Sequence, residues 1–193
     1  MQIEYEATFT DIDKDDMRAR LRKAGAKLLR PEFLQKRVVF KLPAGHEIEG
    51  GWLRVRDEGD KITMTLKAVK DGKIEDQKEI TLQVDNFQQA EYFLTSIGCQ
   101  KKAYQENRRE VWDLDGVEVD LDEWPFLPPY VEVEGASEDK VKQVSKKLGF
   151  DYTQAKFCAA DTLYNLHYGV SKEMINNQIP LITFEMDNPF NGK

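Results

Sequence analysis

Several short stretches of the sequence alternate apolar residues with charges of one sign, and this alternation most limits what the chain can fold into. Glu4 and Glu6 flank Tyr5, and Arg54 and Arg56 flank Val55. Successive side chains of a β-strand point to opposite faces, so each such pair places two like charges on one face. The chain must therefore form a sheet with one apolar face and one face rich in repelling charges.

The same pattern recurs in the later part of the chain. Glu118, Asp120 and Asp122 share a face in VEVDLD, and Glu132 and Glu134 share one in YVEVEG. A half-exposed antiparallel sheet also alternates in this way, which is the alternative for any single strand. Across four strands, however, the polar face is consistently acidic or basic, with few Ser, Thr or Gln. A closed barrel of about eight strands, with a charged interior that can hold one small ligand, satisfies this pattern.

The expected fold is α+β and mainly β: a closed antiparallel eight-stranded barrel, or tunnel, with helices packed on the outside. Period-two patterns predict strands over 2–9, 35–42, 52–57, 61–69, 77–84, 104–114, 116–123 and 130–134. Capping residues predict helices from Asp13 to about Ala24, over 86–97, from Ser137 to Gly149 and near 154–167. We expect one domain over residues 1–169 and a C-terminal extension over the Asn-rich residues 170–193, partly ordered or packed on the outside.

Composition excludes several classes of protein. The net charge of −7 and the pI of about 5.0 argue against a duplex nucleic-acid binder, which needs a basic face. The two cysteines form no CxxC pair and the two histidines are too few for a three-histidine zinc site. No apolar run approaches the roughly 20 residues that span a bilayer, and MQIEYEATF does not resemble a secretory signal. We therefore expect a cytoplasmic protein without a membrane partner.

Five short motifs follow one another in order: Glu-x-Glu from Glu4, LRVR, TLK, NRREVW, and Asp122 placed ten residues before the first Glu of EVE. This ordered set resembles the CYTH, or triphosphate tunnel metalloenzyme, family over most of the chain, from Glu4 to about Tyr164. The resemblance implies an eight-stranded tunnel that binds a triphosphate together with Mg²⁺ or Mn²⁺. Members of that family include inorganic, thiamine and RNA triphosphatases and class IV adenylyl cyclases.

The resemblance also implies roles for individual residues. The expected metal-side carboxylates are Glu4, Glu6, Glu132 and Glu134, while Glu79 and Asp122 would hold a metal directly or through water, or orient the basic residues. The expected phosphate-binding residues are Arg54, Arg56, Lys67 and Arg109, with Lys36, Arg37, Lys78 and Lys156 as further candidates whose alternative is ordinary surface charge. Of these, Glu4, Glu6, Lys67 and Arg109 are the expected catalytic residues. Arg offers a planar fork to phosphate oxygens, and Mg²⁺ prefers oxygen ligands.

Two positions depart from the family pattern. Thr8 stands where the first strand of the family carries Lys, and Val39 stands where a later strand carries Tyr, a pair that helps to activate water in hydrolytic members. Three functions therefore stay open. The leading hypothesis is metal-dependent hydrolysis of a triphosphate. The alternatives are conversion of ATP to cyclic AMP, as in class IV adenylyl cyclases, and binding of nucleotide or polyphosphate without turnover. The expected partner is ATP, inorganic triphosphate or thiamine triphosphate, and the expected state is a monomer or homodimer.

Overall fold

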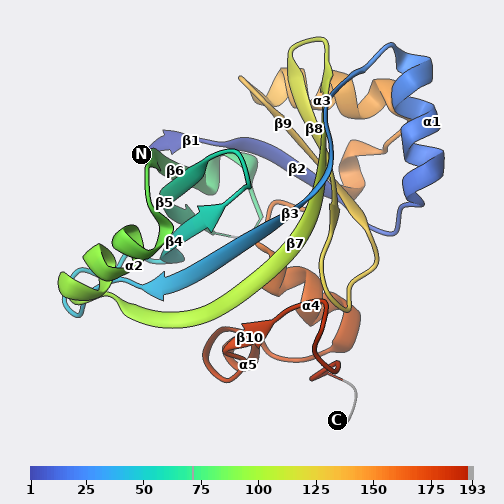
Figure 1. Ribbon diagram of the computed structural model, residues 1–193. Helices are drawn as coiled ribbons and strands as arrows, with labels where there is room; N and C mark the ends of the chain where they lie inside the picture. Colours follow the sequence, from blue (N-terminus) through green and yellow to red (C-terminus); the bar gives the residue numbers. More distant parts are fainter. Residues whose placement is uncertain (71, 191–193) are drawn as a thin grey trace.

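A computed structural model describes residues 1–70 and 72–190 of the chain. Nine strands form one path in the order β1-β6-β5-β4-β3-β7-β8-β9-β2, in which neighbouring strands are antiparallel, and the path curls into a nearly closed barrel (Figure 1). The bounds are β1 (Gln2–Ile3), β2 (Tyr5–Phe9), β3 (Lys27–Lys41), β4 (Gly51–Asp57), β5 (Ile62–Val69), β6 (Gln77–Val84), β7 (Gln100–Leu114), β8 (Val117–Glu123) and β9 (Tyr130–Gly135).

The barrel closes along the beginning of the chain. Strands β1 and β2 are separated only by Glu4, and they form the two ends of the path. Ile3 of β1 lies opposite Lys78 of β6, while Tyr5 of β2 lies opposite Gly135 of β9. Counted as one interrupted strand, β1 and β2 give the eight barrel strands that the sequence predicts, and the mainly β barrel is confirmed.

The two longest strands, β3 and β7, pair with each other over nearly their whole length, from Lys27 opposite Asp113 to Lys41 opposite Gln100. The sequence predicts later starts for both strands, at residues 35 and 104. The difference arises because the first half of β3, KLLRPEFL, has no period-two pattern. Pairing with β7, rather than local alternation, keeps that half extended.

Three of the four predicted helices are confirmed: α1 (Lys14–Ala24), α2 (Phe87–Ser96) and α3 (Glu138–Lys147). Asp13 caps α1 by accepting from the backbone N–H groups of Asp15 and Asp16. The fourth prediction began too early, because α4 (Ala160–Tyr168) follows a short 3-10 turn, η2 (Tyr152–Gln154). Residue 156 is held extended between them, since Lys156 and Thr8 exchange two backbone hydrogen bonds of 2.9 Å.

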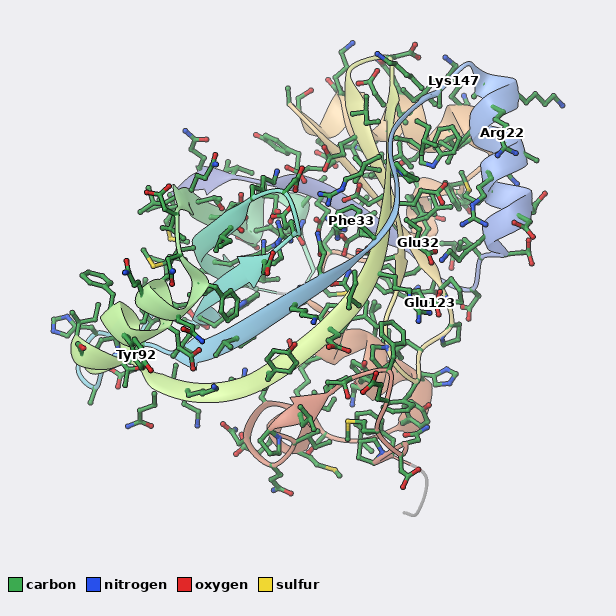
Figure 2. All side chains as sticks on the ribbon, viewed as in Figure 1. Arg22, Glu32, Phe33, Tyr92, Glu123 and Lys147 are labelled. Carbon is green, nitrogen blue, oxygen red and sulfur yellow. The ribbon has the colours of Figure 1, made fainter. Side chains whose placement is uncertain are left out.

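The helices cover the apolar outer face of the barrel. Met17 and Leu21 of α1 and Val141 of α3 join one hydrophobic cluster with outward residues of β2, β7, β8 and β9. On the other side, Leu94 of α2 packs in a second cluster with residues of β3 and β4 (Figure 1). Tyr92 of α2, labelled in Figure 2, is 70% exposed and lies outside that cluster. Within the described residues, no helix combines the length and apolar composition needed to cross a membrane.

The C-terminal segment packs against the barrel beside β7 (Figure 1). It contains α4, α5 (Lys172–Asn177) and β10 (Leu181–Ile182), and β10 pairs in parallel with Tyr104 and Gln105 of β7. Its apolar residues join Trp124 and Tyr130 in a third hydrophobic cluster. The predicted boundary at residue 170 stays a prediction, and residues 191–193 of the expected extension lie outside the described residues.

Removing a buried side chain of α1 tests whether the outer helices hold the barrel together. Leu21 is fully buried, so Leu21→Ala is expected to lower the free energy of unfolding by about 2–5 kcal/mol in urea denaturation. Leu29 is 52% exposed on β3, and Leu29→Ala is the control, with an expected change within about 0.5 kcal/mol. Equal losses in both variants would show that the contact between α1 and the barrel is not what stabilises the fold.

Candidate functional site

Rows of carboxylates cross three neighbouring strands inside the barrel. Glu6 of β2 lies opposite Glu134 of β9, and Glu134 in turn lies opposite Glu118 of β8. One step along, Asp120 lies opposite Glu132. Ala7, Val119, Val131 and Val133, at the alternate positions of these strands, pack in the outer cluster under α1 and α3. We call Glu6, Glu118, Asp120, Glu132 and Glu134 the acidic wall. Like charges directly opposite one another destabilise a sheet, so the acidic wall needs a compensating cation.

Basic side chains line the strands on the other side of the path. Arg37 of β3 lies opposite Arg56 of β4, with Arg54 two positions along β4. Lys67 of β5 lies opposite Trp52 of β4 on one side and Glu79 of β6 on the other. We call Arg37, Arg54, Arg56 and Lys67 the basic wall.

Two arginines of the basic wall carry a buried N–H group without a partner in the described part of the chain, whereas Arg56 pairs with Glu58 at 2.8 Å. The Nε atoms of Arg37 and Arg54 are buried and have no hydrogen-bond partner among the described residues. Burial, together with the neighbouring Arg54, Arg56 and Arg109, moves the pKa of Arg37 well below its usual range. Burial and Arg54 lower the pKa of Arg56 to about 10. An anion placed between these groups would satisfy the free N–H donors and offset the repulsion.

One cavity of about 970 Å³ separates the two walls. Its lining includes the basic wall and eighteen acidic or basic residues outside it, among them Glu79 and Asp122. Pockets for small molecules usually measure about 300–1,000 Å³. The cavity is therefore at the upper end of that range.

Three carboxylates of the acidic side converge closely enough to share a cation. One oxygen from each of Glu4, Glu6 and Glu134 lies within 4.8 Å of the others. Burial, with Glu4 and Glu134 nearby, raises the pKa of Glu6 to about 8, and burial with Glu4 nearby raises that of Glu134 to about 7. An all-oxygen, negatively charged set of this kind fits a hard divalent cation such as Mg²⁺ or Mn²⁺.

Lys67 connects the basic wall to these carboxylates. Its ammonium lies 2.5 Å from Oε2 of Glu4. Burial opposes the charged form of Lys67, but Glu6 and Glu4 outweigh it and raise the pKa of Lys67 above its usual value. Burial likewise opposes the ionised form of Glu4, yet Lys67 lowers the pKa of that carboxyl. The pair is therefore ionised, and Lys67 carries a positive charge near neutral pH.

Arg109 of β7 is surrounded by carboxylates. Its Nε donates to Oδ1 of Asp122 at 2.8 Å, and one terminal nitrogen lies 2.5 Å from both Asp122 and Glu132. The other terminal nitrogen forms an ion pair with Asp120. Although burial opposes it, these three carboxylates raise the pKa of Arg109 well above its usual range. Arg109 therefore fixes the acidic side chains that flank the cavity.

Most residues predicted from the sequence meet in this cavity. Its lining includes Glu4, Glu6, Arg37, Arg54, Arg56, Lys67, Glu79, Arg109, Asp122, Glu132 and Glu134. Three other candidates, Lys36, Lys78 and Lys156, are not part of that lining. Lys36 and Lys78 are exposed, and the ammonium of Lys156 donates to the hydroxyl of Thr10 at 3.2 Å.

The two positions that depart from the family pattern lie in or beside the site. Val39 lines the cavity with an apolar side chain. Thr8 is 2% exposed, and its backbone is paired with Lys156. Neither position supplies an amine or a phenol. The sequence prediction missed Lys102 and Asn176, which also line the cavity, because nothing in the local pattern places either of them there.

The fold and the two walls define a class of protein: a nearly closed β-barrel with a charged cavity along its interior. The family profile of the CYTH domain matches residues 2–163 of the chain. The chain therefore belongs to the CYTH family, whose typical members are enzymes that act on a triphosphate. No curated protein matches the chain.

Solved structures share the fold. A conserved hypothetical protein from Pyrococcus furiosus has a TM-score of 0.68 and 22% identity over 83% of this chain and 99% of its own. A candidate adenylate cyclase from Vibrio parahaemolyticus has a TM-score of 0.73 and 9% identity over 85% and 98%. A candidate adenylyl cyclase from Hippeastrum, described as having a dominant triphosphatase activity, has a TM-score of 0.55 and 15% identity over 87% and 97%. At these identities the likeness concerns the fold alone.

The raised pKa values predict how the stability of the metal-free protein depends on pH. Burial raises the pKa of Glu6 and of Glu132 to about 8 from an ordinary 4.5, so the folded chain holds protons that the unfolded chain has lost. Their contribution to stability is therefore present below about pH 4.5 and is lost as the pH rises toward about 8. In EDTA, Glu6→Gln is expected to raise the melting temperature at about pH 8 more than at about pH 5.

The control for this experiment is Glu75→Gln, because Glu75 is an exposed carboxylate outside the cavity. It is expected to change the melting temperature equally at both pH values. An equal response of Glu6→Gln at both pH values would contradict the burial of a protonated carboxyl at this position.

Proposed function

We propose that the protein binds a triphosphate with Mg²⁺ or Mn²⁺ in this cavity and hydrolyses it. The observation that carries the proposal is the pairing of two incompletely compensated walls. Arg37 and Arg54 hold buried, unpaired N–H groups on one side, and Glu4, Glu6 and Glu134 converge on the other. A metal–triphosphate complex offers phosphate oxygens to the first wall and a cation to the second.

Each wall would act in its own way on the substrate. Arg37, Arg54 and Arg56 would bind phosphate oxygens through their forked N–H groups, and Lys67 would add a point charge between phosphate and Glu4. Glu4, Glu6 and Glu134 would hold the metal, which when bound lowers the pKa of a coordinated water. Arg109 would keep Asp122 and Glu132 in place beside it, and Glu79 would lie next to Lys67. Phosphoryl transfer requires mainly such positioning and charge neutralisation.

The relatives support this class of substrate. Two of the three solved structures named above are described as candidate adenylate cyclases, and one of these carries the description of a dominant triphosphatase activity. Family membership supports a triphosphate as the substrate. The description of the Hippeastrum protein favours hydrolysis over cyclisation as the first reaction to test.

Binding without turnover is the second candidate, and the side chain of Val39 favours it. An apolar residue lines the cavity at the position where hydrolytic members carry the Tyr of the water-activating pair. Lys67 does not replace the missing amine as a base, because Glu6 and Glu4 keep it protonated against the effect of burial on its pKa. A positioned general base contributes about 10²–10⁴-fold to a rate. Its loss would leave a slow enzyme or a binding protein.

Turnover assays on the purified protein test the proposal. Tripolyphosphate, ATP, GTP and thiamine triphosphate would be incubated with Mg²⁺ or Mn²⁺, and released phosphate and cyclic nucleotide would be measured. Glu4→Ala and Arg56→Ala are each expected to lower phosphate release by about 100-fold or more, because each removes a charge that faces the substrate.

Arg20→Ala is the matched control, since Arg20 forms an ion pair with Asp16 on the outside of α1. Formation of a cyclic nucleotide without release of orthophosphate would show that the reaction is cyclisation and not hydrolysis. Metal-dependent binding without any product would support the second candidate. Absence of both binding and product for every compound would reject the triphosphate site.

A further inference from the structure

One edge of β7 lacks a barrel partner along its first half. Strand β8 pairs with residues 108–114 of β7, whereas β3 pairs along the opposite edge from Gln100 onward. The C-terminal segment fills this gap, because β10 pairs with Tyr104 and Gln105 on the edge that β8 leaves open. An unpaired strand edge is unfavourable, so the segment completes the barrel wall here.

A β-bulge in β7 turns a lysine toward this added wall. Val39 lies opposite Ala103 and Phe40 lies opposite Lys101, which leaves Lys102 as the extra residue of the bulged strand. Bulges re-aim side chains next to functional sites. Lys102 lines the cavity, and its ammonium donates to Oδ1 of Asn176 at 2.5 Å.

Asn176, which accepts from Lys102, is itself held in place by a second hydrogen bond. Its Nδ2 donates to Oδ2 of Asp161 at 2.6 Å, so one amide links β7 to α5 and α4. Burial lowers the pKa of the Lys102 ammonium, and Lys41 adds to this effect, whereas the charges of Asp161 and Glu173 oppose it. Among the described residues, Asn176 is the one side chain that accepts a hydrogen bond from this ammonium, which leaves further N–H donors at the cavity.

A second unsatisfied donor lies in the same cavity. Trp124 is 5% exposed, and its Nε1 has no hydrogen-bond partner among the described residues. Its ring packs edge-on against Tyr164 of α4, with 6.5 Å between centroids, and both residues line the cavity. A buried N–H without a partner is costly, which points to an acceptor supplied by a ligand.

This region adjoins the basic wall, because the guanidinium of Arg37 lies over the ring of Trp124, 4.6 Å from its centroid. It is lined by α4 and α5 residues such as Asp161, Tyr164, Ile175 and Asn176, which we call the C-terminal wall. The CYTH profile ends at residue 163, so α5 and β10 lie beyond the part of the chain that the family shares. The cavity of about 970 Å³ is continuous from the charged walls to the C-terminal wall.

We propose that the C-terminal wall, with Lys102 and Trp124, forms a second subsite for an organic group esterified to the triphosphate. This inference rests on the proposed function and adds the substrate class: an organic triphosphate whose organic part carries hydrogen-bond acceptors. Lys102 and Trp124 offer N–H donors to those acceptors, and Asn176 acts as a positioning residue that holds Lys102. A bare inorganic triphosphate occupies the charged walls alone.

Binding measurements on the full chain with Mg²⁺ test this subsite. The probes are tripolyphosphate, ATP, GTP and thiamine triphosphate, titrated by calorimetry. At least one organic triphosphate is expected to bind as tightly as tripolyphosphate or more tightly. Lys102→Met is expected to weaken that organic triphosphate by about tenfold while changing tripolyphosphate by less than about twofold.

Lys101→Met is the matched control, because Lys101 is exposed and pairs with Glu91 at 2.6 Å on α2. Trp124→Phe keeps an aromatic ring, removes the N–H donor, and is expected to repeat the selective loss. Circular dichroism and melting curves verify that each variant is folded. The C-terminal wall would be rejected if both variants weaken all four probes equally, or if every organic triphosphate binds about tenfold more weakly than tripolyphosphate to the unaltered protein. Failure of all four probes would instead reject the proposed function itself.

Discussion

Repulsion between like charges inside the barrel is the constraint on which the rest of the structure depends. Glu118, Glu134 and Glu6 form one cross-strand row, and Arg37 faces Arg56 across another pair of strands. Such rows destabilise a sheet, so hydrophobic packing elsewhere must supply the stability. The outer clusters under α1, α2 and α3 do so. The two parts of the fold therefore differ in role: the outer clusters stabilise the barrel, and the interior carries the charged side chains that face the cavity.

Two basic residues reduce the repulsion between carboxylates inside the barrel in the absence of a ligand. Lys67 pairs with Glu4, and Arg109 pairs with Asp120, Asp122 and Glu132. Both cations sit among the carboxylates, whereas Arg37 and Arg54 retain unpaired N–H groups. The internal ion pairs thus offset part of the repulsion and leave a defined remainder. That remainder is positive on one wall and negative on the other, which matches the two halves of a metal–phosphate complex.

Period-two alternation made most of the candidate site predictable, because it assigns each charge to one face of a strand. The same rule separates Arg37, which lines the cavity, from its exposed neighbour Lys36. Features that depend on contacts between distant segments were not predictable. The extended backbone at Lys156 depends on Thr8, and the position of Lys102 depends on a bulge opposite β3. The pairing of β10 with β7 has no local signal, since two residues are too few to show a period.

The closure of the barrel by its first strand has a kinetic consequence. The beginning of the chain is synthesised first, yet Tyr5 must wait for Gly135 before β2 can pair, and Ile3 must wait for Lys78. Contacts between residues so distant in sequence carry a large loop-closure cost, and folds dominated by them form slowly. The carboxylates of the acidic wall therefore assemble only after the first 135 of the 193 residues have left the ribosome. Until then Glu4 and Glu6 remain on an unpaired strand, and the charges that repel one another in the finished barrel are still apart.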